Sequence, residues 1–513
     1  MIKVQVKWNK TTFDNLEIDA ALGVEVLKAQ LFDLSNVPVD KQKLMFKGKI
    51  LKDDTDMVAL GITTGSQLLM MGTAIGGELK KPETVIKFVE DMTPEERARI
   101  LHEKTGEALP AGLVNLGNTC YMNATVQSLK RVNELKDALK NYNPAPGQQA
   151  VFDQGTIMSK AGKGLFTNLD FKGEPFEPVQ FVQAMRTVYP QFDETDDHGH
   201  HKQQDAEECY TSLLSAFKSA LTLPPEERAE SGFNDLIEKL FSIELVTTLK
   251  NKEEPEEPVE EKKEQVLRLS CHIDSSTNHV NHVSEGIKLS LEGDIEKQSA
   301  LLGRNCVYFK QQKVNKLPSY LTVHFVRFYW KKDSVTSGTK AGKAKILKSV
   351  QFPKVLDVYD HCTDELKKSL DLGREFERKL REEEDARRLT GKADAEMKDE
   401  EQKVVATKPI DKFMQKAQEI KRADEDLYRP HGQGLDAGHY QLVAVVTHKG
   451  RSADGGHYVG WVHKSGDEWL QYDDDIVTTV KVDEILMLKG GGDWHTAYLC
   501  IYRKLEVCKP QQE

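Results

Sequence analysis

The sequence predicts an α+β protein in which a small mixed domain precedes a much larger one. The chain has 513 residues, which is too long for one ordinary hydrophobic core. Residues 1–74 change between the periodicity of strands and that of a helix, and the polar, proline-containing stretch 75–105 is typical of a linker. Residues 106–505 form one large region with charged insertions at 251–264 and about 370–426. We expect both insertions to be solvent-exposed loops, helical or disordered.

The elements of the first domain follow from its apolar pattern. Alternating residues predict a strand at 2–8 and its hairpin partner at 13–18. Apolar residues three or four apart predict a helix over 24–34, and short apolar runs predict strands at 44–46 and 67–71. The expected order is therefore strand, strand, helix, strand, strand.

Composition argues against several classes of protein. The formal net charge of −11 argues against broad binding to a phosphate backbone, so no nucleic acid is expected as a partner. The seven cysteines are scattered and include no Cys-x-x-Cys pair, which favours a reducing compartment without disulfides. The N-terminus lacks the apolar run of a signal peptide, and no segment is long and apolar enough to cross a bilayer. We therefore expect no membrane association and a cytoplasmic and nuclear location.

The segment 112–129, GLVNLGNTCYMNATVQSL, has the pattern of a catalytic loop that leads into a helix. Glycines and asparagines favour tight turns before Cys120, and the apolar residues after it recur at helical spacing. A thiol at a helix N-terminus lies at the positive end of the backbone dipole, which favours thiolate. Asn115 could turn its amide towards a developing oxyanion beside the Cys120 N–H. A buried structural cysteine is the alternative.

A base for this thiol is available near the C-terminus, in GGHYVGWVHKSGDEWLQYDDD. The two glycines allow the chain to turn tightly before His457, and the residues after it predict two strands joined by a turn. Asp473 would lie across this hairpin from His457 and could accept a hydrogen bond from the imidazole. Asp474 and Asp475 are close rivals for that role.

Other histidines compete with His457 for the role of base. His439 lies in a similar Gly-His-Tyr triplet, but no acidic cluster returns to it across a hairpin, so the pattern favours His457. His448 is expected at the surface, and His495 is expected to be structural.

Four segments in order resemble those of one enzyme family. The segment 112–129 is similar to the cysteine box of the ubiquitin-specific proteases, and GGHYVGWV followed by YDDD is similar to their histidine box. Between them, QQDAEECYTSLL (203–214) and LPSYLTVHFVRF (317–328) resemble two further family segments. The resemblance spans about 112–502 and implies a papain-like cysteine protease domain with thumb, palm and fingers.

The resemblance also implies roles for individual residues. The implied catalytic residues are Cys120 as nucleophile, His457 as general base, Asp473 as its orienting acid and Asn115 as oxyanion donor. Asp205 and Glu208 match acidic positions that hold the basic C-terminal tail of ubiquitin. Many family members carry a zinc ribbon in the fingers, whereas the corresponding region here has only Cys271 and Cys306. We therefore expect no structural metal and no cofactor.

The first domain resembles ubiquitin. The stretch QKLMFKGKILKDD (42–54) is similar to the middle strand and turn of ubiquitin, which predicts a β-grasp ubiquitin-like domain. Its tail differs, because GTAIGGELKKPE replaces the Arg-rich segment and two terminal glycines, so we expect a built-in docking domain. By the alignment, Met45, Leu69 and Met71 fall on or beside the apolar patch that partners of ubiquitin bind. One or two of them could instead belong to the core.

A ubiquitin-like domain, a linker and a protease in this order resemble the proteasome-associated members of the family. That resemblance implies thiol-dependent hydrolysis of isopeptide bonds at the C-terminal glycine of ubiquitin. It implies ubiquitin and ubiquitinated proteins as substrates, and the proteasome regulatory particle as the partner of the ubiquitin-like domain. It also implies that loops 331–345 and 450–456 cover the tail groove until docking moves them. Two alternatives stay open: an adaptor that binds ubiquitin and the proteasome with weak or conditional catalysis, and a protease for a different ubiquitin-like modifier.

Overall fold

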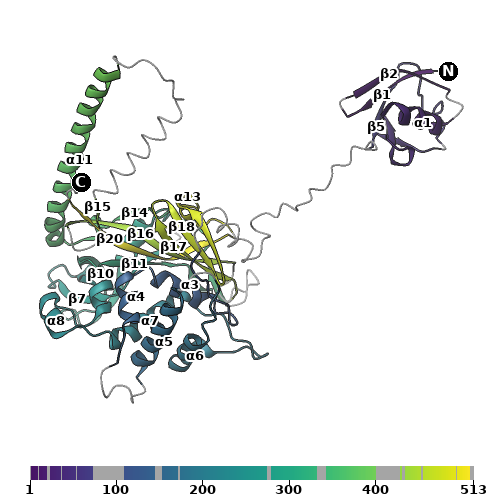
Figure 1. The fold of residues 1–513 in the computed structure, drawn as a ribbon. Helices are drawn as coiled ribbons and strands as arrows, with labels where there is room; N and C mark the ends of the chain where they lie inside the picture. The colour runs from purple at the N-terminus through teal and green to yellow at the C-terminus, as the bar shows by residue number, and fades with distance from the viewer. Residues whose placement is uncertain are drawn as a thin grey trace. The chain divides into compact units, whose positions relative to one another are not determined.

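The structure is a computed structural model of the chain, and it divides into two compact units, Met1–Met92 and Thr93–Glu513 (Figure 1). The residues that it describes are 2–9, 11–19, 23–35, 37–53, 55–72, 109–144, 153–170, 174–273, 279–331, 342–399, 428–429, 434–451, 455–492 and 494–508. The predicted linker at 75–105 lies outside these residues. Among the described residues, no helix combines the length and the apolar composition that crossing a bilayer requires.

The first unit is a five-stranded sheet with a helix packed on one face. Its elements are β1 (Ile2–Trp8), β2 (Thr11–Ile18), α1 (Val24–Ser35), the short helix η1 (Val39–Lys41), β3 (Lys43–Phe46), β4 (Lys49–Leu51) and β5 (Gln67–Met71). The strand order is β2-β1-β5-β3-β4, and β1 runs parallel to β5. The predicted helix and four predicted strands are confirmed, and β4 is an additional strand that the apolar pattern did not indicate.

The core of this unit follows the predicted periodicity with one exception. Leu27 and Leu31 of α1 are fully buried, as helical spacing predicts, but Leu34 is 53% exposed. Four residues after Leu31, the inward position of the last turn is occupied by Ser35. The Ser35 hydroxyl accepts a hydrogen bond from the Val37 N–H (3.3 Å), so the end of the helix has a polar inward residue instead of a leucine.

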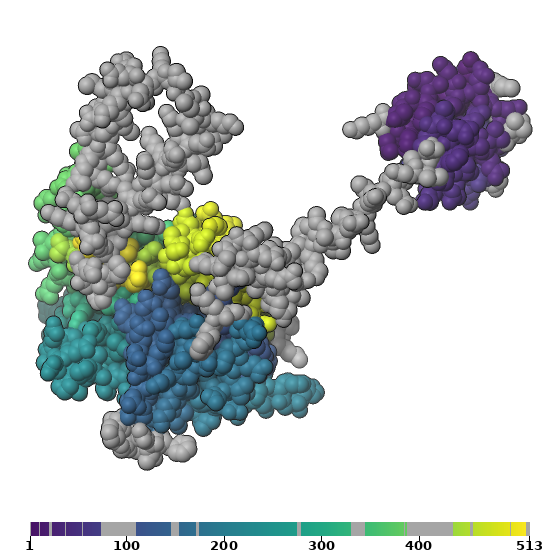
Figure 2. Space-filling model, viewed as in Figure 1, coloured from purple at the N-terminus to yellow at the C-terminus, as the bar shows by residue number. Residues whose placement is uncertain are grey.

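The second unit begins with a group of helices that lies on one side of a large sheet (Figure 1). These helices are α3 (Cys120–Leu129), α4 (Asn133–Lys140), α5 (Gln154–Asn168), α6 (Val179–Val188), η4 (Pro190–Asp193), α7 (Ala206–Ala220), α8 (Pro225–Ser231) and α9 (Leu236–Phe241). A continuous apolar core joins the helices to the neighbouring strands. In the space-filling view, the early helices (blue) lie directly against the C-terminal strands (yellow) (Figure 2).

The large sheet has the strand order β19-β18-β17-β16-β20-β11-β8. Its members are β8 (Leu269–His272), β11 (Tyr320–Val326), β16 (Leu435–Lys449), β17 (His457–Ser465), β18 (Glu468–Asp473), β19 (Ile476–Lys481) and β20 (Thr496–Val507), with β14 (Val355–Asp357) paired to β16 and β15 (Tyr428–Arg429) paired to β20. The short helices η5 (Tyr359–His361) and α13 (Val482–Leu486) adjoin it. The predicted strand, turn and returning strand after His457 are confirmed as β17 and β18.

A smaller four-stranded sheet, in the order β7-β6-β10-β9, corresponds to the fingers. Its strands and accompanying elements are β6 (Ile243–Asn251), β7 (Glu260–Val266), α10 (Val283–Leu291), β9 (Glu292–Gln298) and β10 (Asn305–Lys316), and a separate two-stranded ribbon pairs β12 (Phe328–Lys331) with β13 (Gly342–Lys345). The acidic stretch 251–264 is therefore not a loop insertion, because it supplies the turn and most of the second strand of the β6–β7 hairpin.

A buried carboxylate explains why this acidic stretch is ordered. Glu257 accepts hydrogen bonds from the Asn251 side chain (2.5 Å), the Tyr308 hydroxyl (2.8 Å), the Ser299 hydroxyl (3.0 Å) and the Ala300 N–H (3.0 Å). These bonds, that to Asn251 above all, lower the pKa of Glu257 to about 2. One carboxylate thus links the β6–β7 turn to the β9–β10 turn. Local charge predicted an exposed loop because three of these partners, Ser299, Ala300 and Tyr308, lie 42 or more residues away in the sequence.

The second charged stretch forms a long helix, α11 (Asp364–Asp399), and its remainder at 400–426 lies outside the described residues. Leu380 and Phe376 pack on Ala437 at the base of the helix. Glu377, in the same part of α11, lies 3.1 Å from His439 Nε2. The competing histidine of the Gly-His-Tyr triplet is therefore paired with an acid of the insertion.

Candidate active site

Cys120 is the first residue of α3, and the loop before it is held by its own side chains. Asn115 Oδ1 accepts hydrogen bonds from the N–H groups of Gly117 and Thr119 (both 3.1 Å), and the Thr119 hydroxyl accepts one from the Leu116 N–H (2.9 Å). Gly117 has a φ of +89°, the left-handed conformation that favours glycine. The turn places the Cys120 N–H at the open N-terminus of the helix. The cysteine is only 3% exposed.

The cysteine loop rests on the turn between β18 and β19. The Leu113 N–H donates to the Asp474 carbonyl (2.8 Å). A Cβ added to Gly112 would lie 2.4 Å from the Asp475 carbonyl oxygen, so only glycine allows this approach. Helix α3 also crosses β17 closely, because a Cβ at Gly460 would lie 3.1 Å from the Ala124 carbonyl oxygen. These contacts bring the start of the domain against its C-terminal hairpin.

His457 and Asp473 are directly bonded, with His457 Nε2 2.5 Å from Asp473 Oδ1. The hydrogen bond to Asp473 and a second one to Cys120 raise the pKa of His457 to about 10, against the opposing effect of burial. Burial acts to raise the pKa of Asp473, but its bond to His457 and the charge of His457 outweigh burial and lower it. The structure thus brings together Cys120, His457 and Asp473, and gives the imidazole a positive charge at neutral pH.

Asp474, a rival in the sequence for the role of Asp473, has different partners. Its two carboxylate oxygens accept from Asn115 Nδ2 (2.9 Å) and Asn123 Nδ2 (2.8 Å). Its nearer oxygen lies 4.0 Å from His457 Nε2, well beyond the distance of Asp473. Burial raises the pKa of Asp474 despite these hydrogen bonds. Asp474 therefore positions the amide of Asn115, the predicted oxyanion donor.

Asn123 is a site residue that sequence reasoning missed. It lies three residues after Cys120 on α3, is almost fully buried, and bonds both to Asp474 and to the Leu113 carbonyl (3.2 Å). An asparagine inside a helix is unfavourable for helix formation. Because Asn123 lies about one turn after Cys120 on the same face of the helix, this asparagine was a sequence signal for a specific polar partner near the nucleophile.

The two predicted tail-binding acids occupy the start of α7. Asp205 is the N-cap of this helix, where it accepts from the N–H groups of Glu207 (2.7 Å) and Glu208 (3.4 Å). It also accepts a hydrogen bond from the Tyr498 hydroxyl (2.7 Å), and burial raises its pKa. Glu208 is exposed in the first turn of the helix. Asp205 is thus fixed by internal bonds, while Glu208 is open to solvent.

The expectation that His448 lies at the surface is wrong. The side chain is fully buried, with its ring 4.7 Å from that of Tyr458 and 5.2 Å from that of Phe328. Burial lowers its pKa to about 3, so it is neutral. His448 ends a run of buried residues on β16 that begins at Leu442, and its polar side chain alone does not indicate this. His495 is buried and contacts the Thr447 hydroxyl through Nδ1 (3.2 Å).

One lysine connects the ends of the two loops that the family resemblance placed over the tail groove. Their central parts, 332–341 and 452–454, lie outside the described residues. At the end of β13, Lys345 Nζ donates to the carbonyl oxygens of His448 (2.7 Å) and Gly450 (3.0 Å). Lys345 thus ties the β12–β13 ribbon to the segment that leads into His457.

In the first unit, the predicted docking residues lie across adjacent strands. Met45 pairs with Leu69 on one side and with Ile50 on the other, and Lys43 pairs with Met71. Leu69, Met71 and Ile50 are exposed by 44%, 55% and 59%, while Met45 is half-buried. The core positions on these strands are instead Leu44, Phe46, Leu68 and Met70. Leu69 and Met71 are therefore surface residues, and Ile50 extends the same apolar row.

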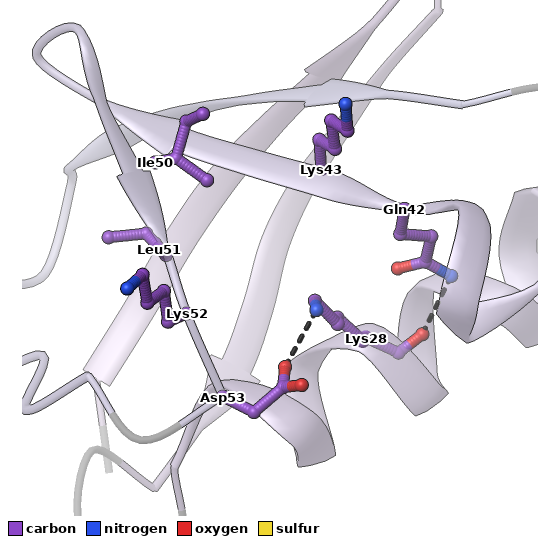
Figure 3. A pocket seen from close by; sticks show the side chains of 7 residues that line it. All are labelled: Lys28, Gln42, Lys43, Ile50, Leu51, Lys52 and Asp53. Atoms are coloured by element: carbon purple, nitrogen blue, oxygen red, sulfur yellow. Dashed lines mark hydrogen bonds and ion pairs between the residues drawn. The ribbon is translucent and has the colours of Figure 1, made fainter.

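A groove of about 470 Å³ adjoins this row (Figure 3). Figure 3 shows Ile50 and Lys43 beside it, with the Lys28–Asp53 ion pair (2.6 Å) at its base. The amide nitrogen of Gln42 donates to the Lys28 carbonyl (2.9 Å), which holds β3 against α1. The apolar row therefore lies next to a basic, grooved surface.

A thiol at a helix N-terminus, hydrogen-bonded to a histidine that an aspartate orients, defines a cysteine hydrolase. The fingers, the helical layer and the central sheet around it are those of a papain-like domain. The chain belongs to the ubiquitin carboxyl-terminal hydrolase family, whose sequence model matches residues 111–502, and the model of the ubiquitin family matches residues 2–75.

Curated relatives match the chain over almost its whole length. Ubiquitin carboxyl-terminal hydrolase 6 of Arabidopsis thaliana is 42% identical over 98% of this chain and 99% of the relative. Ubiquitin carboxyl-terminal hydrolase 7 of the same plant is 41% identical, again over 98% and 99%. Ubiquitin carboxyl-terminal hydrolase 14 of Caenorhabditis elegans is 36% identical over 97% of this chain and 92% of the relative. These matches include both units.

Proposed function

We propose that this chain is a proteasome-associated deubiquitinase that hydrolyses isopeptide bonds at the C-terminal glycine of ubiquitin. The observation that carries the proposal is the hydrogen-bonded set of Cys120, His457 and Asp473 in a domain of the ubiquitin carboxyl-terminal hydrolase family. The reaction is thiol-dependent, and the residues that perform it require no cofactor.

The reaction begins with the protonated imidazole of His457 beside the sulfur. Because Asp473 occupies His457 Nε2, the other ring nitrogen is available to Cys120. The thiolate attacks the carbonyl carbon of the last glycine, and the tetrahedral oxyanion is stabilised by the Cys120 N–H and the Asn115 amide. His457 then protonates the departing lysine amine, which leaves a thioester. A water molecule, deprotonated by His457, hydrolyses the thioester and restores the thiolate pair.

Asn115 is suited to its role because Asp474 holds only one of its amide hydrogens. The bond from Nδ2 to Asp474 fixes the plane of the amide, and the backbone N–H groups of Gly117 and Thr119 fix the oxygen. The second Nδ2 hydrogen remains for the oxyanion. A donor that is positioned before the reaction stabilises the transition state without reorganisation.

Recognition of the ubiquitin tail is assigned to the acids at the start of α7. Glu208 is exposed and can pair with an arginine of the tail. Asp205 holds the helix terminus and the Tyr498 hydroxyl in place beside it. A narrow acidic channel at this place would favour a basic tail that ends in small residues.

The ubiquitin-like domain would provide attachment to the proteasome through the row Ile50, Met45, Leu69 and Met71. Exposed apolar residues in a contiguous row are typical of an interaction site, and Lys43 and Lys52 beside it favour an acidic partner surface. We expect Leu69→Asp to reduce co-sedimentation with proteasomes about tenfold or more, with hydrolysis by the free enzyme unchanged. Val58→Asp, at a residue 65% exposed outside the row, is the matched control. Equal loss in both variants would contradict this docking site.

The catalytic proposal is tested with ubiquitin that carries an electrophilic C-terminus. We expect covalent labelling of the wild type and none of Cys120→Ala, which should still bind ubiquitin. The adaptor alternative has two observations in its favour, since Cys120 is only 3% exposed and Lys345 ties the adjacent loops. Labelling only after proteasome is added would indicate a gated enzyme, and no labelling in either condition would favour the adaptor. Preferential labelling by a probe made from another ubiquitin-like modifier would favour the alternative of a protease for that modifier.

A further inference from the structure

In addition to His457, the side chain of Gln203 reaches the sulfur of Cys120. Gln203 Nε2 donates to Cys120 Sγ across 3.9 Å. Gln203 lies before α7 in the segment 203–214, in which the family resemblance assigns roles only to the acids Asp205 and Glu208. Its side chain is half-buried, so part of the competing water is excluded. Hydrogen bonds of resting active sites are often long and shorten when charge develops.

The segment that carries Gln203 is anchored on both sides. Two residues before it, the His201 carbonyl accepts from Asn118 Nδ2 (2.8 Å) of the cysteine loop. Two residues after it, Asp205 caps α7 and accepts from the Tyr498 hydroxyl. Asn118 itself has a left-handed φ of 54°, which aims its side chain out of the cysteine loop. The backbone on both sides of Gln203 is therefore held, and on the side of His201 it is held by the cysteine loop itself.

The other groups at the sulfur leave this donor a distinct role. His457 contributes one hydrogen bond to Cys120, and its partner Asp473 lies behind it. Asn115 directs its amide to Asp474 and to the site of the oxyanion. Gln203 is a neutral donor, so it can stabilise negative charge on sulfur without competing for the proton that His457 must keep for the leaving amine.

We propose that Gln203 is a catalytic residue whose side-chain amide donates a hydrogen bond to the Cys120 thiolate and favours the thiolate–imidazolium pair from which attack starts. The thiol proton is held by His457 in this pair and later passes to the lysine amine. When sulfur bonds to carbon, its charge moves to the oxyanion, and the Gln203 bond weakens. This inference deepens the proposed hydrolase reaction and rests on it.

The test measures the sulfur without ubiquitin. Iodoacetamide reacts with thiolate, so the rate of Cys120 alkylation in the full-length chain is followed by mass spectrometry between about pH 5 and pH 10. The variants are Gln203→Ala and Gln203→Met, which keeps the length of the side chain without an N–H. Gln204→Ala is the matched control. The charged neighbours His457, Asp473 and Asp474 are unchanged in every variant.

We expect the midpoint of the alkylation profile to move up by about half to one pH unit in both Gln203 variants and to stay in place in Gln204→Ala. The midpoints are compared and not the absolute rates of alkylation, because a smaller side chain at position 203 also widens the access of iodoacetamide to the sulfur. Below the midpoint of the wild type, hydrolysis of ubiquitin with a fluorogenic C-terminal amide should lose about three- to tenfold in kcat, the share of thiolate that such a shift removes, with KM unchanged. A wild-type alkylation midpoint in Gln203→Met would overturn the proposal, whatever happens to kcat. If all variants hydrolyse nothing, including the wild type, the failure belongs to the proposed function, and the alkylation profiles still decide the role of Gln203.

Discussion

Asp474→Asn provides the sharpest test of how the oxyanion donor is positioned. The substitution keeps the shape of a side chain that is only 9% exposed, but it replaces one carboxylate oxygen by an NH₂ group. Both oxygens are in use, one by Asn115 and one by Asn123. An asparagine at position 474 can accept from only one of them, so the other amide meets a donor instead of an acceptor.

The size of the effect follows from the bond that is lost. A hydrogen bond to a buried charged group contributes about 1.5–3 kcal/mol. If the loss falls on Asn115, the oxyanion donor is no longer positioned, and kcat should fall about 10- to 150-fold with KM unchanged. If it falls on Asn123, the free energy of unfolding should drop by about the same amount while kcat is retained. The 4.0 Å separation from His457 predicts little direct effect on the imidazole.

The assay is hydrolysis of ubiquitin carrying a fluorogenic C-terminal amide, with denaturant unfolding measured in parallel. Asp475→Asn is the control, because it changes the neighbouring acid of the same turn, for which no side-chain hydrogen bond occurs among the described residues. A double variant with Asn115→Ala should be no slower than Asn115→Ala alone. Unchanged kcat together with unchanged stability in Asp474→Asn would refute the reasoning.

Three further predictions concern the histidine, the fingers and the loops. The pKa of His457 is raised to about 10, so the charged pair of His457 and Cys120 persists until the pH approaches that value. Asp473→Asn should therefore move the alkaline limb of the kcat/KM profile to lower pH and reduce kcat by about 10- to 1,000-fold. Identical alkaline limbs in the variant and the wild type would argue against the charged pair. The pKa of Glu257 is lowered from 4.5 to about 2, so the stabilising effect of the carboxylate is complete above pH 4.5 and is lost as the pH falls from 4.5 to about 2. Glu257→Gln should flatten the pH dependence of the free energy of unfolding in this range. Parallel curves for the variant and the wild type would contradict this prediction. Lys345→Ala removes two hydrogen bonds between the two loops. Labelling of the free enzyme by ubiquitin with an electrophilic C-terminus should therefore become several-fold faster. Equal or slower labelling would exclude Lys345 as a restraint on the loops.

The sequence was informative where a function depends on local pattern. The turn-rich loop before Cys120 and the hairpin after His457 are encoded by glycine positions and apolar periodicity, and both have the predicted form. The identity of the acid was less certain, for a geometric reason. The register pairs Gly460 with Tyr472, and continuing it would place His457 opposite Asp475. The chain leaves β18 at Asp473 instead and turns through Asp474, whose φ is 53°. Periodicity does not reveal where a strand ends within a run of identical residues.

Contacts between distant segments could not be predicted from local pattern. Glu257 is buried because four partners from the two hairpins of the fingers surround it, although its neighbours in the sequence are charged. His448 is buried against the rings of Phe328 and Tyr458, which belong to other strands, and its own polar side chain did not indicate this. Gln203 lies 83 residues from Cys120, and Asp474 lies 359 residues from Asn115. Such pairs depend on tertiary packing, which overrides local composition.

The same long separations make the reactivity of Cys120 a property of the assembled domain. The sulfur receives bonds from His457 of β17 and from Gln203 before α7, while its loop rests on the β18–β19 turn. None of these contacts can form until the helical layer packs on the large sheet, and at Gly112 and Gly460 this packing leaves little or no room for a Cβ atom. An alanine at Gly112 would force the cysteine loop away from the Asp475 carbonyl, and an alanine at Gly460 would press on the backbone of Ala124, so each would shift this packing. We therefore infer that substitutions at these glycines reduce thiolate reactivity and stability together, in contrast to Asp474→Asn, in which the two effects are separable.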